Sequence, residues 1–160
     1  MNIQLRDAKP ADAELMHRVS LQAWRGRVAE TSSLYDETVD YVTGVLDRGG
    51  GLLLFIEGEL AGSVRYFPLD HQGDCWEVKR LGVIAAHRKR GFGELMMKAV
   101  HARARSAGIA RIQLGVRADQ PNLVRFYEAL GYKLDDTVVL SAQNPRTAAA
   151  ITLSRRMDES

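Results

Sequence analysis

The stretch that decides the fold is residues 77–93, which reads Glu77-Val78-Lys79-Arg80-Leu81-Gly82-Val83-Ile84-Ala85-Ala86-His87-Arg88-Lys89-Arg90-Gly91-Phe92-Gly93. Its first half alternates apolar and polar side chains as a strand does, and its second half is a basic turn with two glycines. Apolar side chains then recur at helical spacing from Phe92 to Val100. The stretch therefore predicts a strand over residues 77–84, a glycine turn, and a helix over residues 91–106.

The N-terminus of this helix is suited to an anion. The first amides of a helix have no acceptor within the helix, and the helix dipole presents its positive end there. Gly91 and Gly93 let phosphate oxygens approach the backbone, and Arg88, Lys89 and Arg90 bring positive charge to the same turn. The turn lacks the Gly-Lys-Ser/Thr ending of a P-loop and the third glycine of a dinucleotide fingerprint, so it is neither of these.

Composition limits the domain count and the classes of partner. With 160 residues, 46% of them apolar, the chain is expected to form one domain over residues 1–160. A net charge of +2 gives no support to a nucleic-acid partner. No apolar run approaches the ~18 residues of a membrane span, and no signal-peptide pattern opens the chain. The lone cysteine, Cys75, suits a reducing compartment and is expected to be a buried packing thiol, so we expect a cytoplasmic protein with no membrane partner.

The rest of the chain alternates strand and helix patterns. Further strands are expected at residues 3–5, 52–56, 60–67, 111–117, 132–140 and 147–157, further helices at 12–24, 36–46 and 121–130, and a turn at 71–74. This order predicts an α/β (α+β) fold with a mixed, mostly antiparallel sheet of six or seven strands and about four helices on its two faces.

A second motif reads Asn122-Leu123-Val124-Arg125-Phe126-Tyr127-Glu128-Ala129-Leu130-Gly131-Tyr132. Together with residues 77–93 it resembles motifs B and A of the GNAT N-acetyltransferase superfamily, in an order and at a separation that fit the family. The resemblance covers residues from about 75 to 133. It implies a single GNAT-type domain with splayed central parallel strands, and acetyl-CoA as the acyl donor.

The resemblance also implies which residues form the cofactor site. The diphosphate would lie against the glycine turn, and the backbone of β-strand residues before the turn would bind the pantetheine arm and supply an oxyanion donor. The implied cofactor residues are Leu81, Gly82, Val83, Arg88, Lys89, Arg90, Gly91, Phe92, Gly93, Glu94, Gln120 and Tyr127. Gln120 is a departure, because the family usually has Asn seven residues before the tyrosine.

Two catalytic roles are implied as well. A lysine-like amine has a pKa of ~10.4, so presenting it neutral at pH 7 costs about 4 kcal/mol, whereas the leaving thiol has a pKa of only ~8.5. Glu77 is the implied base, directly or through water, and Tyr127 the implied acid. From the residues alone, Glu77 also fits a surface ion pair with Lys79 or Arg80, and Tyr127 also fits a core aromatic.

The expected function is therefore acetyl-CoA-dependent N-acetyltransfer to a primary amine of a small molecule or peptide, by direct attack in a ternary complex. The alternative is a non-catalytic CoA-sensing or partner-binding module. Acidic side chains between Glu30 and Asp40 fit either a site for a cationic amine or a solvated helix face. The four histidines have no ligand spacing, so no metal is expected. Dimers are common among GNAT proteins, so the resemblance allows a homodimer, and no motif identifies the acceptor.

Overall fold

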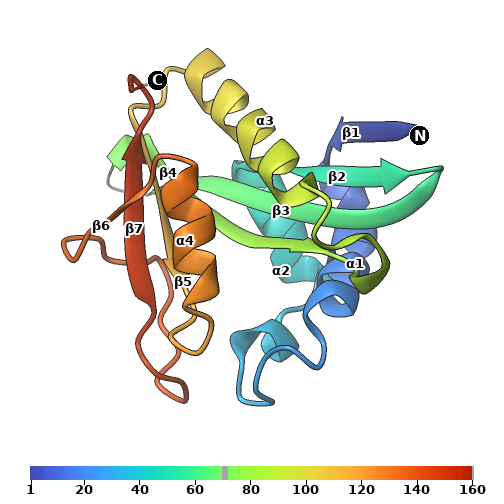
Figure 1. Cartoon of the computed structure of the whole chain (residues 1–160), viewed down its shortest axis with the longest axis horizontal. Coiled ribbons are helices and arrows are strands. Elements are labelled where there is room, and N and C mark those ends of the chain that lie inside the picture. Colours follow the sequence, from blue (N-terminus) through green and yellow to red (C-terminus); the bar gives the residue numbers. More distant parts are fainter. Residues whose placement is uncertain (70–71, 160) are drawn as a thin grey trace.

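The computed structural model describes residues 1–69 and 72–159, and these form one seven-stranded sheet in the order β1-β2-β3-β4-β5-β7-β6 (Figure 1). The strands are β1 (Ile3–Asp7), β2 (Gly50–Ile56), β3 (Glu59–Leu69), β4 (Gln72–Val83), β5 (Arg111–Val116), β6 (Lys133–Leu134) and β7 (Ile151–Arg156). The helices are α1 (Ala13–Trp24), α2 (Val39–Arg48), α3 (Phe92–Ser106) and α4 (Asn122–Ala129), with short 3-10 turns at η1 (Pro10–Asp12), η2 (Ser33–Asp36) and η3 (Ala85–His87). β4 and β5 are parallel and the other neighbours antiparallel, which confirms the predicted fold class.

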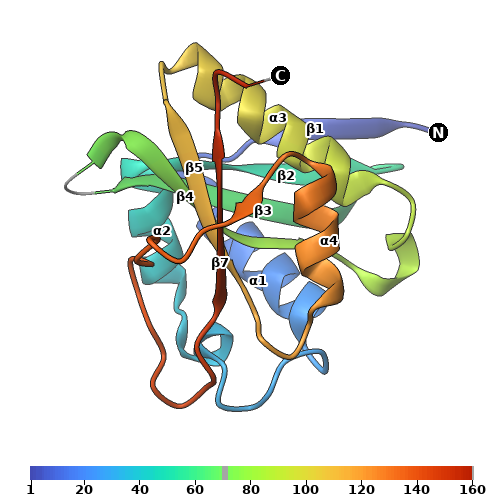
Figure 2. The same ribbon diagram turned by 60° about the vertical axis from the view of Figure 1, so that its left-hand side comes forward.

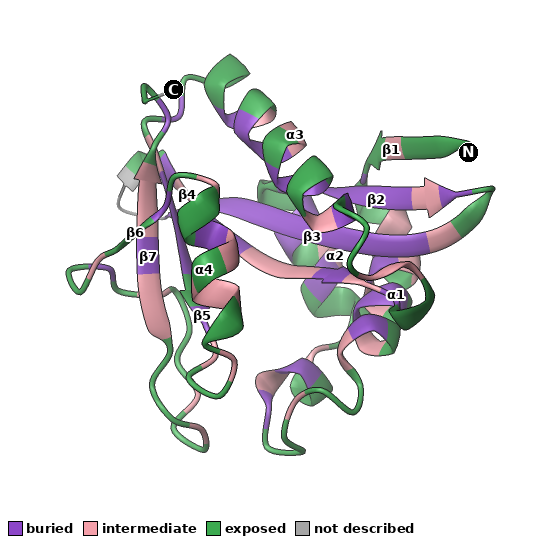
Figure 3. Ribbon diagram, viewed as in Figure 1, coloured by how far each residue is buried: buried purple, intermediate pink, exposed green. Residues whose placement is uncertain are grey.

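Helices cover both faces of the sheet. α1 and α2 lie on one face, and α3 and α4 on the other (Figures 1 and 2). The amphipathic face of α3 buries Met96, Met97 and Val100 against the apolar side chains of the central strands. Burial is therefore concentrated along β2, β3 and the inner face of α3 (Figure 3). Cys75 is buried beside Val45, Phe67 and Leu69, as expected of a packing thiol.

A bulge divides β4 into two halves. Ser63 lies opposite Gly82 and Arg65 opposite Lys79, so β4 has one residue more than β3 between these pairs. Arg80 accommodates the extra residue by adopting a φ of +58°. Beyond the bulge, β4 no longer follows β5, since their parallel pairing is confined to residues 75–77 and 111–113. The splay predicted for the central strands is thus present, and it opens the sheet at their ends (Figure 1).

Several boundaries differ from the prediction, most of all in the last third of the chain. The strand expected at 132–140 is reduced to β6, and the last strand begins at Ile151, because residues 135–150 form a long loop that bonds to other parts of the molecule. The helix expected from residue 36 begins at Val39, where the Thr38 hydroxyl caps it by accepting a hydrogen bond from Tyr41 N. Part of the turn expected at 71–74 lies outside the described residues, and Gln72–Asp74 belongs to β4.

Candidate active site

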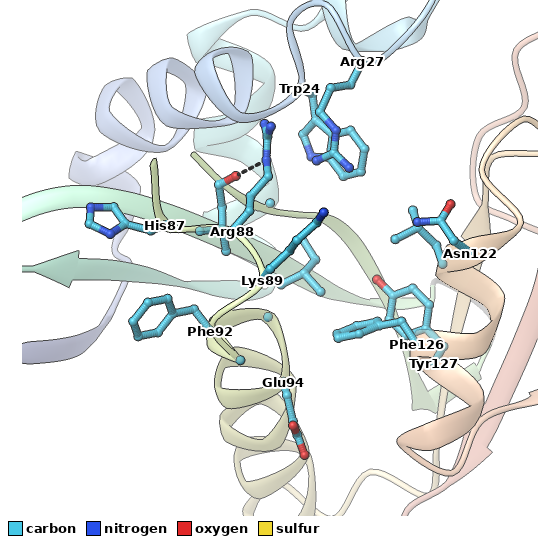
Figure 4. Close-up of a pocket in the computed structure, with 16 residues that line it drawn as sticks. Trp24, Arg27, His87, Arg88, Lys89, Phe92, Glu94, Asn122, Phe126 and Tyr127 are labelled. Atoms are coloured by element: carbon cyan, nitrogen blue, oxygen red, sulfur yellow. Dashed lines mark hydrogen bonds between the residues drawn. The ribbon is translucent and has the colours of Figure 1, made fainter. Parts of the chain in front are cut away.

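A cavity of about 470 Å³ lies between the N-terminus of α3, the second half of β4 and α4 (Figure 4). It brings together most of the residues that the sequence assigned to the cofactor, although they come from three separate elements. The predicted residues that line it are Leu81, Gly82, Val83, Arg88, Lys89, Gly91, Phe92, Gly93, Glu94 and Tyr127. Arg90 and Gln120, also predicted, do not line it.

The turn before α3 presents unpaired backbone amides. The first hydrogen bond of the helix runs from Leu95 N to Gly91 O at 3.0 Å, so the amides of residues 92–94 have no acceptor within the helix. No side chain caps them. Gly91 has a φ of +82°, a conformation that glycine adopts without cost. A Cβ at Gly93 would lie 3.3 Å from Phe126 Cζ, so glycine also lets α3 approach α4 closely.

The three cations of the turn have different surroundings. Arg88 donates from Nε to Val83 O at 3.0 Å and from its guanidinium to Ala23 O, so it fastens the turn to the C-terminus of α1. Arg90 contacts His87 Nδ1 at 3.2 Å and lies over the Phe92 ring, away from the cavity. Lys89 lines the cavity, and its amine extends across it (Figure 4). Of the three predicted cations, Lys89 is therefore the one placed to meet an anion in the cavity.

Tyr127 lies on the buried side of α4. Its ring packs edge to face against Phe126 and Tyr132, with centroids 4.9 Å and 5.6 Å away. Its hydroxyl points into the cavity (Figure 4). Burial raises the pKa of Tyr127 above its ordinary value of 10.0, so the phenol keeps its proton at neutral pH. The residue is thus a packed aromatic whose protonated hydroxyl faces the cavity.

Gln120 holds a neighbouring loop. Its Nε2 donates to Arg27 O at 2.9 Å, which ties the start of α4 to the segment after α1. Its Oε1 is buried and has no partner among the described residues. The position where the family usually has Asn therefore supports the wall of the cavity here.

Glu77 occupies a different environment from the one expected of a base facing the cleft. Its side chain is 1% exposed and lines neither the first cavity nor the two cavities described below. Oε1 accepts hydrogen bonds from Gln113 Nε2 at 3.0 Å and from Ser141 N at 2.9 Å, and Oε2 accepts one from Ser141 Oγ at 2.6 Å. Glu77 does not form the surface ion pair with Arg80 that the sequence also allowed, since Arg80 pairs with Glu37 at 3.0 Å.

A third, smaller cavity, called the passage below, lies between the first cavity and a second one. It has a volume of about 90 Å³ and lies in the splay between β4 and β5. It shares Trp24, Leu81 and Tyr127 with the first cavity, and Lys79, Arg80 and Arg117 with a second cavity of about 730 Å³.

The loop of residues 135–150 walls the second cavity and meets the loop before α2 (Figure 2). Asn144 Nδ2 donates to Thr31 O at 2.8 Å, and Arg146 pairs with Asp36. The site thus has two halves, and the passage lies between them.

Comparison with known proteins identifies this arrangement. The model of the acetyltransferase (GNAT) family matches residues 15–132. The chain belongs to the GNAT family. An acetyltransferase of Sodalis glossinidius is 29% identical to this GNAT chain and one of Yersinia pestis is 28% identical, each over 89 residues. The match covers 56% of the chain and 61% of these relatives, so it spans about three fifths of their length.

A solved structure shares the fold along nearly the whole GNAT chain. The PaiA N-acetyltransferase of Thermoplasma acidophilum, crystallised with coenzyme A, superposes with a TM-score of 0.79 at 17% identity. The alignment covers 98% of this chain and 99% of that protein. The likeness establishes that the two share a fold.

Several residues of the GNAT site were not predicted from the sequence. Trp24, Arg27, Asn122, Leu123 and Phe126 also line the first cavity. Trp24 Nε1 is buried without a partner among the described residues and lies 2.7 Å from where a Cβ of Gly82 would be. The signal in the sequence was an indole at the end of the first amphipathic helix.

The described residues also bear on metal binding and on membrane spans. Within them, no three His, Cys, Asp or Glu side chains are grouped so as to hold a metal ion, and His71 lies outside them. None of the described helices has the length and apolarity that crossing a bilayer requires.

Proposed function

We propose that this GNAT protein is an acetyl-CoA-dependent N-acetyltransferase that acts on a primary amine by direct attack in a ternary complex. The observation that supports this most is the site with two halves. The α3 turn, the β4 bulge and Tyr127 surround one cavity, and the passage beside Tyr127 lies between it and a second cavity large enough for an acceptor. A protein that only bound the cofactor would not need the second half.

The residues of the first cavity fit acetyl-CoA. The unpaired amides of residues 92–94 and the Lys89 ammonium would hold the diphosphate. The backbone of β4 after the bulge, which does not pair with β5, would pair with the pantetheine amides as an added strand does. Trp24 Nε1 is a further donor without a partner, beside this backbone. When bound, acetyl-CoA supplies the activated acyl carbon as a thioester.

Tyr127 is the proposed acid. Its hydroxyl faces the first cavity and its residue also lines the passage, so it lies where the two substrates would meet. The burial that raises its pKa would also raise the basicity of a thiolate formed beside it. The phenol would therefore be protonated when the thiolate forms, and would donate its hydrogen bond or its proton to the sulfur.

Glu77 is proposed as a positioning residue in this mechanism. Its carboxylate accepts three hydrogen bonds and is separated from the cavities, so it has no direct path to the acceptor amine. It instead fixes Ser141 at the start of the wall that encloses the second cavity. The amine would lose its proton to water in that cavity.

Two measurements test the proposed function. Calorimetry with CoA and acetyl-CoA should give dissociation constants below about 1 mM, because the proposed diphosphate site combines backbone amides with the Lys89 charge. Release of free thiol from acetyl-CoA should then depend on an amine from a panel of small molecules and peptides. Binding with no transfer to any amine would favour the non-catalytic module, and absence of binding would remove both.

A further inference from the structure

The second cavity is lined by cations. Lys79, Arg80 and Arg117 face it, and none of the described Asp or Glu side chains lines it. Its remaining wall is uncharged and comes mainly from the loop of residues 135–150. Every charged side chain among the described residues that line this cavity is therefore a cation, which favours an anion there, while Asp36 and Glu37 line a smaller cavity beside it.

Two of these cations already have carboxylate partners. Arg80 donates from Nε to Glu37 Oε2 at 3.0 Å and from Nη2 to Ser33 Oγ at 3.0 Å. Arg117 donates from Nε to Asp119 Oδ1 at 3.1 Å. Their geometry is thus fixed before any ligand arrives.

Lys79 has surroundings different from those of Arg80 and Arg117. It makes no hydrogen bond and no close ion pair with another described residue. Burial lowers the pKa of its ammonium, and the neighbouring Arg80 lowers it further, while Glu77 and Glu37 oppose these effects. An ammonium that is half-buried and unpaired is stabilised by an anion that reaches it. Lys79 lines the second cavity and the passage, so a ligand can reach it from either space.

The acidic side chains of Asp36 and Glu37, beside the second cavity, are already bound by arginines. Glu37 Oε1 accepts a hydrogen bond from Arg65 Nη1 at 3.0 Å, and its other oxygen is taken by Arg80. Asp36 pairs with Arg146. The carboxylates of Glu37 and Asp36 are therefore both paired with arginines.

We infer that the acceptor is a small primary amine that also carries a carboxylate, and that Lys79 binds this carboxylate; the inference rests on the proposed acetyltransfer. The amine must reach the passage that Tyr127 lines, and Lys79 lines the same passage of about 90 Å³. The amine and the carboxylate of the acceptor should therefore be separated by only a few atoms, as in an amino acid. Lys79 would be a specificity-determining residue at the acceptor end of the site.

The experiment compares matched acceptors. Transfer is measured by thiol release for a series of amino acids and short ω-amino carboxylates, each beside its carboxamide and its decarboxylated amine. We expect kcat/KM to favour the carboxylate of each pair by about tenfold or more, mainly through KM, since a charge-assisted hydrogen bond is worth that much in binding. Equal kcat/KM within the pairs would overturn the inference and leave the proposed function intact.

Variants of Lys79 test whether this residue causes the preference for acceptors that carry a carboxylate. Lys79→Met, which keeps the length of the chain and removes the charge, should reduce the preference to near one, and Lys79→Arg should retain most of it. Lys133→Met removes the same charge from an exposed residue of β6 and should keep the wild-type preference. A preference that survives in Lys79→Met with wild-type thermal unfolding would overturn the assignment to Lys79. If acetyl-CoA binds and no acceptor is acetylated, the proposed function fails and the inference fails with it.

Discussion

Ser141 is hydrogen-bonded twice to Glu77, a residue 64 positions earlier in the chain: its Oγ donates to Oε2 at 2.6 Å and its N–H donates to Oε1 at 2.9 Å. The same carboxylate accepts from Gln113, whose Nε2 also donates to Val139 O at 3.0 Å. One buried carboxylate thus joins β4, β5 and the loop that walls the second cavity. The order of that loop should depend on this carboxylate.

Replacing Glu77 therefore separates a positioning role from a catalytic one. Glu77→Ala leaves the Gln113 amide and the Ser141 groups without an acceptor, so the free energy of unfolding should fall by about 3 kcal/mol. Glu77→Gln keeps an acceptor oxygen and should cost about 1 kcal/mol. Urea unfolding measures both.

The kinetics of Glu77→Gln complete this test. If the residue positions the loop, the KM of the acceptor rises, while kcat, the pH–rate profile and the affinity for acetyl-CoA stay near wild type. A kcat reduced by orders of magnitude, with the basic limb of the profile flattened, would instead assign Glu77 as the base.

Tyr127→Phe should lower kcat by about 100-fold with little change in the affinity for CoA, because it removes a proton donor and keeps the packed ring. Burial raises the pKa of Tyr127, so the phenol stays protonated at alkaline pH and should not cause a fall in rate below pH 10. Steady-state kinetics from pH 6 to 10 and calorimetry with CoA check these points. Unaltered turnover in Tyr127→Phe would remove the acid role.

Local patterns predicted the first half of the site well. The strand, glycine turn and helix over residues 77–106 are consecutive in the chain, so alternation, glycines and helical spacing specify them directly. The same holds for α4 and Tyr127. These short-range signals account for most of the cavity beside α3.

The second half depends on contacts between distant segments. The pattern of residues 132–140 fits a strand, yet side chains such as Gln113 and Glu77 hold residues 139–141 in a loop instead. Likewise, the acidic residues near α2 gave no sign that Arg65 and Arg80 would neutralise Glu37. Pairings between residues more than 25 positions apart have no local signature in the sequence. Neither the loop of residues 135–150 nor the cationic lining of the second cavity could therefore be predicted.

Gly91→Ala should weaken CoA binding, and Gly108→Ala is its matched control. Both glycines flank α3 with positive φ, +82° and +74°, and a Cβ at either would meet nothing within 4 Å. Each variant should therefore lose about 1 kcal/mol of stability from backbone strain. Only Gly91 lines the cavity, so only its variant should raise the Kd of CoA, by about tenfold, the equivalent of one charge-assisted hydrogen bond. Equal Kd values in calorimetry would argue against the glycine turn as the diphosphate site.

His101 should make the stability of the fold sensitive to acid. The ring is 4% exposed; its Nε2 lies 2.7 Å from Tyr132 Oη, and its Nδ1 lies 3.2 Å from Arg155 Nη1. Burial, then Arg155 and Arg105, lower its pKa from 6.5 to about 4. Between pH 6.5 and about 4, His101 is therefore protonated in the unfolded chain but neutral in the folded chain. The contribution of neutral His101 to the free energy of unfolding is present above pH 6.5 and is lost as the pH falls toward 4.

His101→Gln tests this sensitivity, because glutamine can accept from Arg155 and donate to Tyr132 without titrating. Between pH 6.5 and 4.5 the free energy of unfolding should decline less steeply in the variant, by up to about 1.4 kcal/mol per pH unit, the effect of one proton. Urea unfolding at several pH values gives both slopes, and their difference cancels the contributions of carboxylates common to the two proteins. Parallel slopes would mean that His101 is protonated equally in the folded and unfolded chains, which its contact with Arg155 should prevent.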